Sequence, residues 1–288
     1  MKKRIAVIGS GIAGLTSGWL CREAGAEVTI LESHTNLGMG THNQFLNVEG
    51  GESGHVDVPL RVMSPHAWPT VLELCEKLGV KTYEVDTQIA CSWLNSRTWF
   101  RSSIIQFGSR MFPWVPLNYL LRQETYRMIF GFIRLFKSDP DLLDSNLTLK
   151  EFSDQNRIDP LFWKGLLYPL LTTICTCDEK TIDHWPAKQI LDLLKKIVFG
   201  ASLRRIQGGT KALADKLGEG LNLQKGIRVE KLVEKSSEIF LHSKNATFGP
   251  FDYVICAVQA NQLNFLPEQY SSESKVLNSF PYDSGTLW

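Results

Sequence analysis

Three glycines close to the N-terminus, Gly9, Gly11 and Gly14, have the spacing of a phosphate-binding turn. The first permits a tight turn from strand to helix, the second leaves room for a pyrophosphate, and the third lets the helix pack close to the strand. Farther along, Glu32 offers a carboxylate that can accept hydrogen bonds from ribose hydroxyls, and its charge repels a 2′-phosphate. These residues predict a site for the ADP half of a dinucleotide other than NADP.

The elements that must position these residues form one strand–helix–strand unit. Residues 5–8 are a fully apolar run, typical of a strand buried on both faces of a parallel sheet. A helix is predicted from the glycine run to about Gly25, and residues 27–31 form a second strand. The unit is a Rossmann-type arrangement in an α/β fold, and its helix N-terminus offers N–H groups to phosphates. The residues expected to contact the cofactor here are Gly9, Ser10, Gly11, Ile12, Ala13, Gly14, Glu32 and Ser33.

The segment that follows Glu32 favours FAD over NAD. An NAD dehydrogenase usually continues with another helix and a third parallel strand. Here two extended pieces are predicted instead, at 41–48 and 55–60, separated by a Gly-Gly turn signal. The next helix is predicted only at 66–78.

On these residues the chain resembles the flavin-containing amine oxidase superfamily, and most closely its branch of predicted FAD-dependent proteins. The resemblance implies FAD and a discontinuous Rossmann-type FAD-binding domain, beside a substrate domain that is largely helical with an added sheet. The stretches that carry it are Ile5–Glu32, Leu37–Thr41, Val56–Val62, Ile206–Leu217 and Arg228–Ala257. The implied domains are 1–65 with 200–262 for FAD binding, 66–199 for the helical domain, and 263–288 for the start of a substrate-domain sheet that is cut short.

The resemblance also implies contacts beyond the ADP fingerprint. Gly38, Gly40 and Thr41 would lie near a phosphate or the ribityl chain, because small residues let the backbone approach. This stretch departs from the family pattern of Gly-Gly-Arg or Gly-Gly-His. Met39 takes the place of the second glycine and Gly40 that of the basic or imidazole side chain, which removes one expected phosphate contact.

Three later residues are implied as cofactor neighbours. The backbone of Val62 would pass near the flavin, Val229 would contact the adenine through its backbone, and Ala257 would lie near the ADP moiety. Pro59 replaces a glycine of the family's Asp-x-Gly pattern, which fixes φ and removes an N–H donor. Ala257 falls in the predicted buried strand 253–258, where Cys256 is expected to be an inert small hydrophobic residue.

Residues 66–200 are predicted to be predominantly helical. The stretch 112–136 is aromatic and carries basic residues, so it fits either a packed helical layer or a helix that touches a membrane surface or guides a greasy substrate. We favour the packed layer. A capping box is predicted at Thr148, with Glu151 three residues later.

No side chain pattern in the chain indicates a nucleophile or an acid–base pair, so the catalytic residues are left unassigned. Cys175, Cys177 and His184 could be read as metal ligands, but no fourth ligand lies at a suitable spacing and we predict no metal site. Ordinary hydrogen-bonding roles are favoured over cofactor contact for His42 and His55.

Composition and charge indicate the class of protein, its partners and its location. The chain has 288 residues, 43% hydrophobic, and a net charge of +1, which suits a globular protein and gives no reason to expect a nucleic-acid partner. Its six cysteines form no dense framework, and no transmembrane segment or secretory signal stands out, so a cytoplasmic location is expected. Family members continue for roughly another hundred residues, which makes this a fragment or a shortened homologue; a natively short form is expected to bind FAD weakly or not at all.

The function that the resemblance implies is FAD-dependent oxidation of a C–N or C–C bond by hydride transfer to flavin. The expected partner is a small-molecule substrate, with hydrophobic molecules among the candidates. Two alternatives stay open: a non-catalytic dinucleotide-binding protein and an NAD-linked dehydrogenase. Fold alone does not name the substrate.

Overall fold

The computed structural model describes residues 2–38, 43–51, 53–58, 61–85, 88–94, 97–107, 110–175, 177–200, 202–280 and 282. The strands are β1 (Arg4–Ile8), β2 (Glu27–Glu32), β3 (Asn43–Leu46), β4 (Gly54–Asp57), β5 (Thr82–Glu84), β6 (Ala90–Ser92), β7 (Thr98–Arg101), β8 (Ser103–Phe107), β9 (Arg110–Trp114), β10 (Arg204–Ile206), β11 (Asn222–Lys225), β12 (Lys231–Lys235), β13 (Glu238–His242), β14 (Thr247–Phe251) and β15 (Tyr253–Cys256). The helices are α1 (Ile12–Glu23), α2 (Pro69–Lys77), α3 (Leu117–Leu120), α4 (Gln123–Lys137), α5 (Leu149–Gln155), α6 (Pro160–Phe162), α7 (Tyr168–Cys175), α8 (Glu179–Asp183), α9 (Ala187–Val198), α10 (Gly209–Gly218) and α11 (Ser271–Asn278). Shorter turns are η2 (Pro140–Leu142), η3 (Trp163–Leu167), η4 (Ala260–Gln262) and η5 (Glu268–Tyr270).

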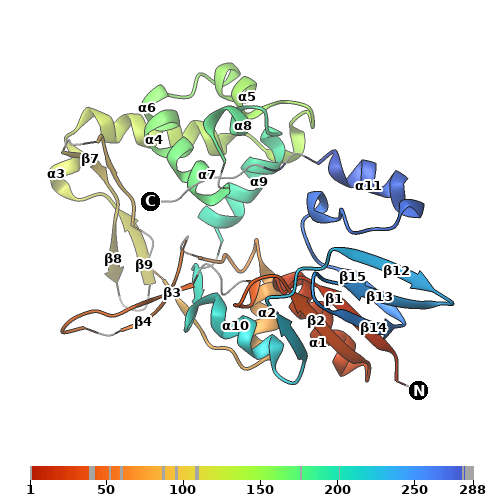
Figure 1. The fold of residues 1–288 in the computed structure, drawn as a ribbon. Coiled ribbons are helices and arrows are strands. Elements are labelled where there is room, and N and C mark those ends of the chain that lie inside the picture. The colour runs from red at the N-terminus through yellow and green to blue at the C-terminus, as the bar shows by residue number, and fades with distance from the viewer. Residues whose placement is uncertain are drawn as a thin grey trace.

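A four-stranded parallel sheet, in the order β11-β2-β1-β15, holds the N-terminal unit together (Figure 1). Ile8, the last residue of β1, lies level with Leu31 on one side and with Cys256 on the other. Parallel strands bring their carboxyl ends to the same edge of a sheet, and a ligand site is expected at that edge. The predicted βαβ unit and the α/β fold class are therefore confirmed.

Successive residues of β1 point to opposite faces of the sheet, and each face is covered by a different layer. Val7 packs with Leu15 of α1 and with Leu213 of α10. Ala6 packs on the other side with Leu241 of β13, in the antiparallel meander β12-β13-β14. The sheet is thus sandwiched between helices and a meander, which fixes the loop after β1 rigidly.

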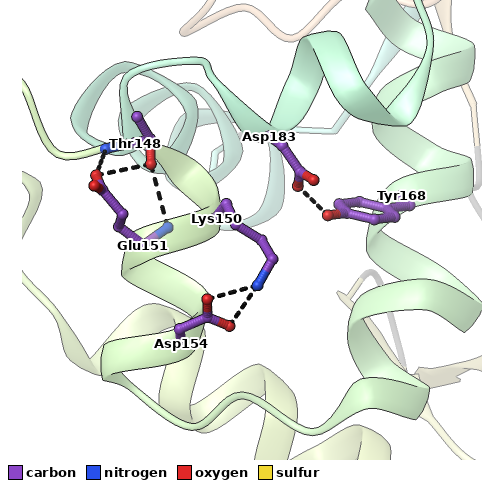
Figure 2. Close-up of polar contacts among 6 residues, drawn as sticks. All are labelled: Thr148, Lys150, Glu151, Asp154, Tyr168 and Asp183. Atoms are coloured by element: carbon purple, nitrogen blue, oxygen red, sulfur yellow. Dashed lines mark hydrogen bonds and ion pairs between the residues drawn. The ribbon is translucent and has the colours of Figure 1, made fainter.

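The helical unit has a core of its own, drawn from α4, α5, α7 and α9 (Figure 1). Phe152 and Phe162 are among its largest fully buried side chains. The predicted capping box at the start of α5 is confirmed: the Thr148 hydroxyl and the Glu151 carboxylate each bond the other's backbone N–H (Figure 2). This arrangement satisfies N–H groups that the first turn of a helix leaves unpaired.

The structure corrects the predicted helical character of the middle segment. Between residues 82 and 114 the chain forms β5 to β9, of which β6 pairs with β7 and β8 with β9 in antiparallel hairpins. Short runs such as 98–101 are aromatic and β-favouring, but apolar runs of this length do not distinguish a strand from part of a helix. The two extended pieces predicted before residue 60 are present as the β3–β4 hairpin.

The packed-layer prediction for residues 112–136 is right for one face of α4 only. Met128 and Leu135 are buried in the helical core. Phe130 and Ile133 are instead 60% and 54% exposed. Among the described residues, no helix is both long and apolar enough to cross a membrane.

Two core assignments bear on the domain boundaries, which remain a proposal. Leu74 and Cys75 of α2 are buried with Val7 of β1, so α2 shares the core of the parallel sheet rather than that of the helical unit. Phe265 is likewise buried against the meander. We therefore propose that the first boundary lies after β5 rather than at residue 65.

The strand at 253–258 differs from its prediction. β15 is an edge strand of the sheet that the structure describes, and Tyr253 is 55% exposed. Cys256 is exposed as well, which corrects the expectation that its thiol is buried. An edge strand has a neighbour on one side only, so apolar composition alone overestimates its burial.

Candidate functional site

Gly9 in the turn after β1 and Gly14 at the start of α1 have no room for a side chain. Gly9 has a φ of +96°, and a Cβ there would lie 2.6 Å from the carbonyl oxygen of Ala257. A Cβ on Gly14 would lie 2.0 Å from the carbonyl oxygen of Gly9. Both roles predicted for these glycines, the tight turn and the close approach of helix to strand, are present in the geometry.

Gly11 is different, because the space above it is open. It precedes α1 with a φ of −60°, and a Cβ there would meet no atom of the described residues within 4 Å. It caps α1 without a side-chain hydrogen bond, and the first turn carries no acidic residue. The position of a Cβ on Gly11 is thus open among the described residues, and it lies at the N-terminus of α1, where a helix offers unpaired N–H groups and the positive end of its dipole to an anion.

Glu32 ends β2 and is buried, yet its carboxylate is surrounded by donors. Oε2 accepts hydrogen bonds from Ser10 N at 2.8 Å and Ser10 Oγ at 2.5 Å. Oε1 accepts from His34 N at 2.8 Å and Ser33 Oγ at 3.2 Å. Burial acts to raise the pKa of Glu32, but these hydrogen bonds outweigh it and lower the pKa below its ordinary value. Glu32 is accordingly a fixed anion beside the turn.

Ser10 links the turn to the segment that follows β2. Its hydroxyl donates to Glu32 and accepts a hydrogen bond from Gly38 N at 2.7 Å. Gly38 lies against the turn, since a Cβ there would be 2.8 Å from Gly11 N. Ser10 is fully buried, and its N–H and O–H both serve Glu32. Its geometry suits positioning of Glu32 and Gly38 better than the direct cofactor contact predicted from the sequence.

A cavity of about 180 Å³ opens at the carboxyl ends of β1 and β2. It brings together Gly9, Ser33 and Val229, three residues that were predicted to contact the cofactor. Its other lining residues are Ile8, Leu31, His34, Ile227, Arg228, Val258, Gln262 and Phe265. Apolar walls with a few polar groups are typical of a cofactor site. The sequence does not predict Gln262 and Phe265 as lining residues, because they follow β15 in a segment that carries no motif.

The remaining predicted cofactor residues are placed differently. Ala257 follows β15 and donates its N–H to Ile8 O at 2.8 Å, so it packs beneath the turn rather than in the cavity. Val62 is half-buried beside Met63, which bridges to Arg204, and it is not among the cavity-lining residues. Gly40 and Thr41, with the departures at Met39 and Pro59, lie outside the described residues.

A buried carboxylate joins the β3–β4 hairpin to α10. Asp57 accepts hydrogen bonds from Thr210 N at 3.0 Å, from Thr210 Oγ1 at 2.7 Å and from Asn43 Nδ2 at 2.9 Å. Gly209, with a φ of +73°, allows this contact, because a Cβ there would lie 2.6 Å from Asn43 Nδ2. The sequence does not indicate this pairing, because Asp57 and Thr210 are 153 positions apart in the chain.

Cys175 and Tyr168 of the helical unit each have a raised pKa. Among the described residues, no group of three His, Cys, Asp or Glu side chains is placed to hold a metal ion. Burial, with a smaller contribution from Cys177, raises the pKa of the Cys175 thiol to about 11. Burial and the hydrogen bond to Asp183 raise the pKa of Tyr168 to about 12, so this phenol stays neutral (Figure 2).

The residues present fit the ADP half of FAD. Any other residue at position 11 would place its side chain in the space over Gly11, whereas glycine leaves that space free for a pyrophosphate. The adjoining cavity reaches Val229, where the adenine contact is expected, and Glu32 supplies the anion that disfavours a 2′-phosphate. Fold and site together define an α/β dinucleotide-binding protein with a separate helical unit.

Comparison with known proteins identifies the family. The model of the family described as flavin containing amine oxidoreductase matches residues 12–285. Flavin-containing amine oxidase A of Canis lupus familiaris is 22% identical, over 96% of this chain and 54% of its own length. Putrescine oxidase, solved with putrescine bound, has a TM-score of 0.59 at 14% identity, over 96% of this chain and 63% of its own. A CLA-producing fatty acid isomerase from P. acnes has a TM-score of 0.61 at 17% identity, over 94% of this chain and 63% of its own.

The chain belongs to the flavin containing amine oxidoreductase family. Membership confirms the prediction of FAD over NAD as the cofactor. The chain spans about half the length of the curated relatives it matches. The solved structures, at these low identities, support the fold alone.

Proposed function

We propose that the carboxyl edge of the parallel sheet holds the ADP half of FAD. In this arrangement the pyrophosphate lies over Gly11 and the N-terminus of α1, where the Cβ-free space and the helix dipole coincide. The adenosine occupies the cavity beside Val229, and Glu32 faces the ribose. The open space over Gly11, between two sterically closed glycines, is the observation that carries the proposal.

Glu32 can serve the ribose only if its present partners rearrange. A carboxylate has about four acceptor positions, and the two Ser10 donors, Ser33 Oγ and His34 N use them. The Ser33 hydroxyl, at 3.2 Å, is the longest of these contacts and the easiest for a ribose hydroxyl to replace. We therefore assign Glu32 a direct role, and Ser10 the role of holding Glu32 in place.

We propose that the protein oxidises a C–N or C–C bond of a small-molecule substrate. FAD, when bound, accepts a hydride equivalent from that bond, and oxygen or another acceptor then reoxidises it. The described residues would bind and orient the cofactor, and we assign no catalytic side chain. Amines are the first substrates to test, because the family and the relatives in it are named as amine oxidases.

The test is spectroscopic. We expect purified protein supplied with FAD to show oxidised-flavin absorbance between about 350 and 500 nm, and to lose it when a substrate amine is added without oxygen. Bleaching by an amine supports oxidation of a C–N bond, and bleaching only by a substrate without nitrogen supports a C–C bond. Bound flavin that no organic substrate reduces would support the non-catalytic alternative and contradict the proposed activity.

A further inference from the structure

Gln262 is a polar residue of the cavity to which the proposed ADP contacts assign no role. It ends the short turn η4 and lines the cavity together with Val229 and Phe265. Its amide nitrogen lies 3.5 Å from Gln259 Oε1, a distance at which a hydrogen bond is weak. Its amide oxygen has no hydrogen-bond partner among the described residues. Gln262 therefore has a donor and an acceptor to offer to a ligand in the cavity.

The backbone on both sides of Gln262 is fastened to the core. Before it, Ala257 donates its N–H to Ile8 O at 2.8 Å, which joins the segment to β1. After it, Phe265 is buried against the meander, and its carbonyl oxygen accepts a hydrogen bond from Leu232 N at 2.9 Å. The Gln262 side chain thus extends from backbone that is already held beside the cavity, which lowers the entropy cost of binding a ligand.

Adenine, the base of FAD, differs from guanine in the groups on its edges. The Hoogsteen edge of adenine places the N6 amino donor beside the N7 acceptor, whereas guanine has two acceptors there, O6 and N7. A glutamine amide has one donor and one acceptor side by side, so it pairs with N6 and N7 of adenine through two hydrogen bonds. The same amide cannot make both hydrogen bonds to guanine.

The other polar side chains that line the cavity do not match this edge of adenine. Arg228 has donors only, and they suit the two acceptors of guanine. The Ser33 hydroxyl is a single group and already donates to Glu32 at 3.2 Å. The ring of His34 can offer one nitrogen to a given edge of a base. Among the described lining residues, Gln262 is thus the one whose side chain carries the pattern complementary to adenine.

We propose that Gln262 determines the base specificity of this site by pairing with N6 and N7 of adenine. The inference rests on the proposed binding of the ADP half of FAD in the cavity. Gln262 Nε2 would donate to N7, and Gln262 Oε1 would accept from one N6 hydrogen. This pairing leaves N1 and the second N6 hydrogen to the backbone of Val229, which lines the same cavity and is expected at the adenine.

The experiment is titration calorimetry of the purified chain with ADP and with 7-deaza-ADP, in which a C–H group replaces N7. This change removes the acceptor for Gln262 Nε2 and leaves N1 and N6 in place. We expect the unchanged chain to bind 7-deaza-ADP about tenfold more weakly than ADP, because the amide loses one of its two hydrogen bonds. Equal affinity for the two nucleotides would overturn the proposal.

The variant Q262L tests whether Gln262 is the residue that contacts N7. Leucine is similar in size and has no polar atom, so Q262L should bind ADP about tenfold more weakly than the unchanged chain does. It should also bind ADP and 7-deaza-ADP equally, because the two changes remove the same interaction. A preference for ADP that persists in Q262L would show that another group contacts N7 and would overturn the proposal.

N261L is the matched control. Asn261 is exposed on the same turn and is not among the cavity-lining residues, so N261L should bind both nucleotides like the unchanged chain. A circular dichroism spectrum like that of the unchanged chain confirms that each variant is folded, as expected for substitutions at exposed positions.

The outcomes separate this inference from the proposed function. ADP binding that does not depend on N7 would overturn the role of Gln262 and leave the ADP site standing. A folded chain that binds neither ADP nor FAD would overturn both. GDP serves as a third ligand, and GDP binding as tight as that of ADP would show that Gln262 does not select the base, since the two acceptors of guanine suit Arg228 instead.

Discussion

Replacement of Asp57 by alanine tests how the hairpin β3–β4 is fastened to α10. The carboxylate is 6% exposed and receives hydrogen bonds from three donors, Thr210 N, Thr210 Oγ1 and Asn43 Nδ2. A buried donor that loses its partner costs about 1–3 kcal/mol. Asn43 is only half-buried and can turn towards water, so we expect the free energy of unfolding to fall by about 3–5 kcal/mol.

The assay is urea unfolding followed by circular dichroism. D57N keeps the shape of the side chain but turns an amide N–H₂ towards the donors, so we expect a smaller loss of about 2–3 kcal/mol; it also provides a measurement if D57A does not fold. D154A is the control, because it breaks only the exposed ion pair with Lys150 (Figure 2) and should cost about 0.5 kcal/mol or less. A loss below about 1 kcal/mol in D57A would refute the reasoning.

Three further substitutions test other parts of the fold. Because the pKa of Glu32 is lowered in the folded protein, its carboxylate stabilises the fold above the ordinary glutamate pKa of 4.5, and this contribution is lost as pH falls through the lower folded-state pKa. In urea unfolding at a series of pH values, E32Q should therefore lose less stability in acid than the unchanged chain. Identical pH profiles would contradict this. G131V should destabilise by about 3 kcal/mol or more in thermal unfolding, because its Cβ would lie 2.3 Å from Phe162, and an unchanged midpoint would show that the two helices separate freely. T148A should cost about 1 kcal/mol through loss of the capping box, with E151Q as a milder comparison, and a neutral T148A would argue against the cap.

The turn and strands of the N-terminal unit could be predicted because their determinants are local. Gly9, Gly11 and Gly14 each answer a steric demand of one short turn, and the apolar runs of β1 and β2 are complete within a few residues. The capping box at Thr148 is local in the same sense. Where the residues that decide a structure lie close together in the chain, their types and spacing carry the information.

Other features depend on residues far apart in the chain and could not be read from it. The pairing of Asp57 with Thr210 crosses 153 positions. The cavity draws Gln262 and Phe265 from a turn without a motif. The exposure of Cys256 follows from the position of β15 at the edge of the sheet, which its apolar sequence does not encode.

The strands between residues 82 and 114 illustrate a different limit. Their elements are three to five residues long, too short for the periods of helix and strand to be separated. The exposed face of α4 shows a related limit. Tyr126, Phe130 and Ile133 have the spacing of a core-facing stripe, and spacing does not say which of two apolar faces is buried.

The central claim is that the space over Gly11 receives the pyrophosphate of FAD, and titration calorimetry with FAD tests it most directly. A Cβ at this position would meet no atom of the described residues within 4 Å, so we expect G11V to unfold within about 1 kcal/mol of the unchanged chain. G54A, at a second glycine with open space around it, is the control. We predict that the unchanged chain and G54A bind FAD, that ADP competes with it, and that G11V loses binding at least about a hundredfold because its side chain occupies the pyrophosphate position. FAD or ADP binding that G11V leaves intact, or a folded unchanged chain that binds neither FAD nor ADP, would contradict the account.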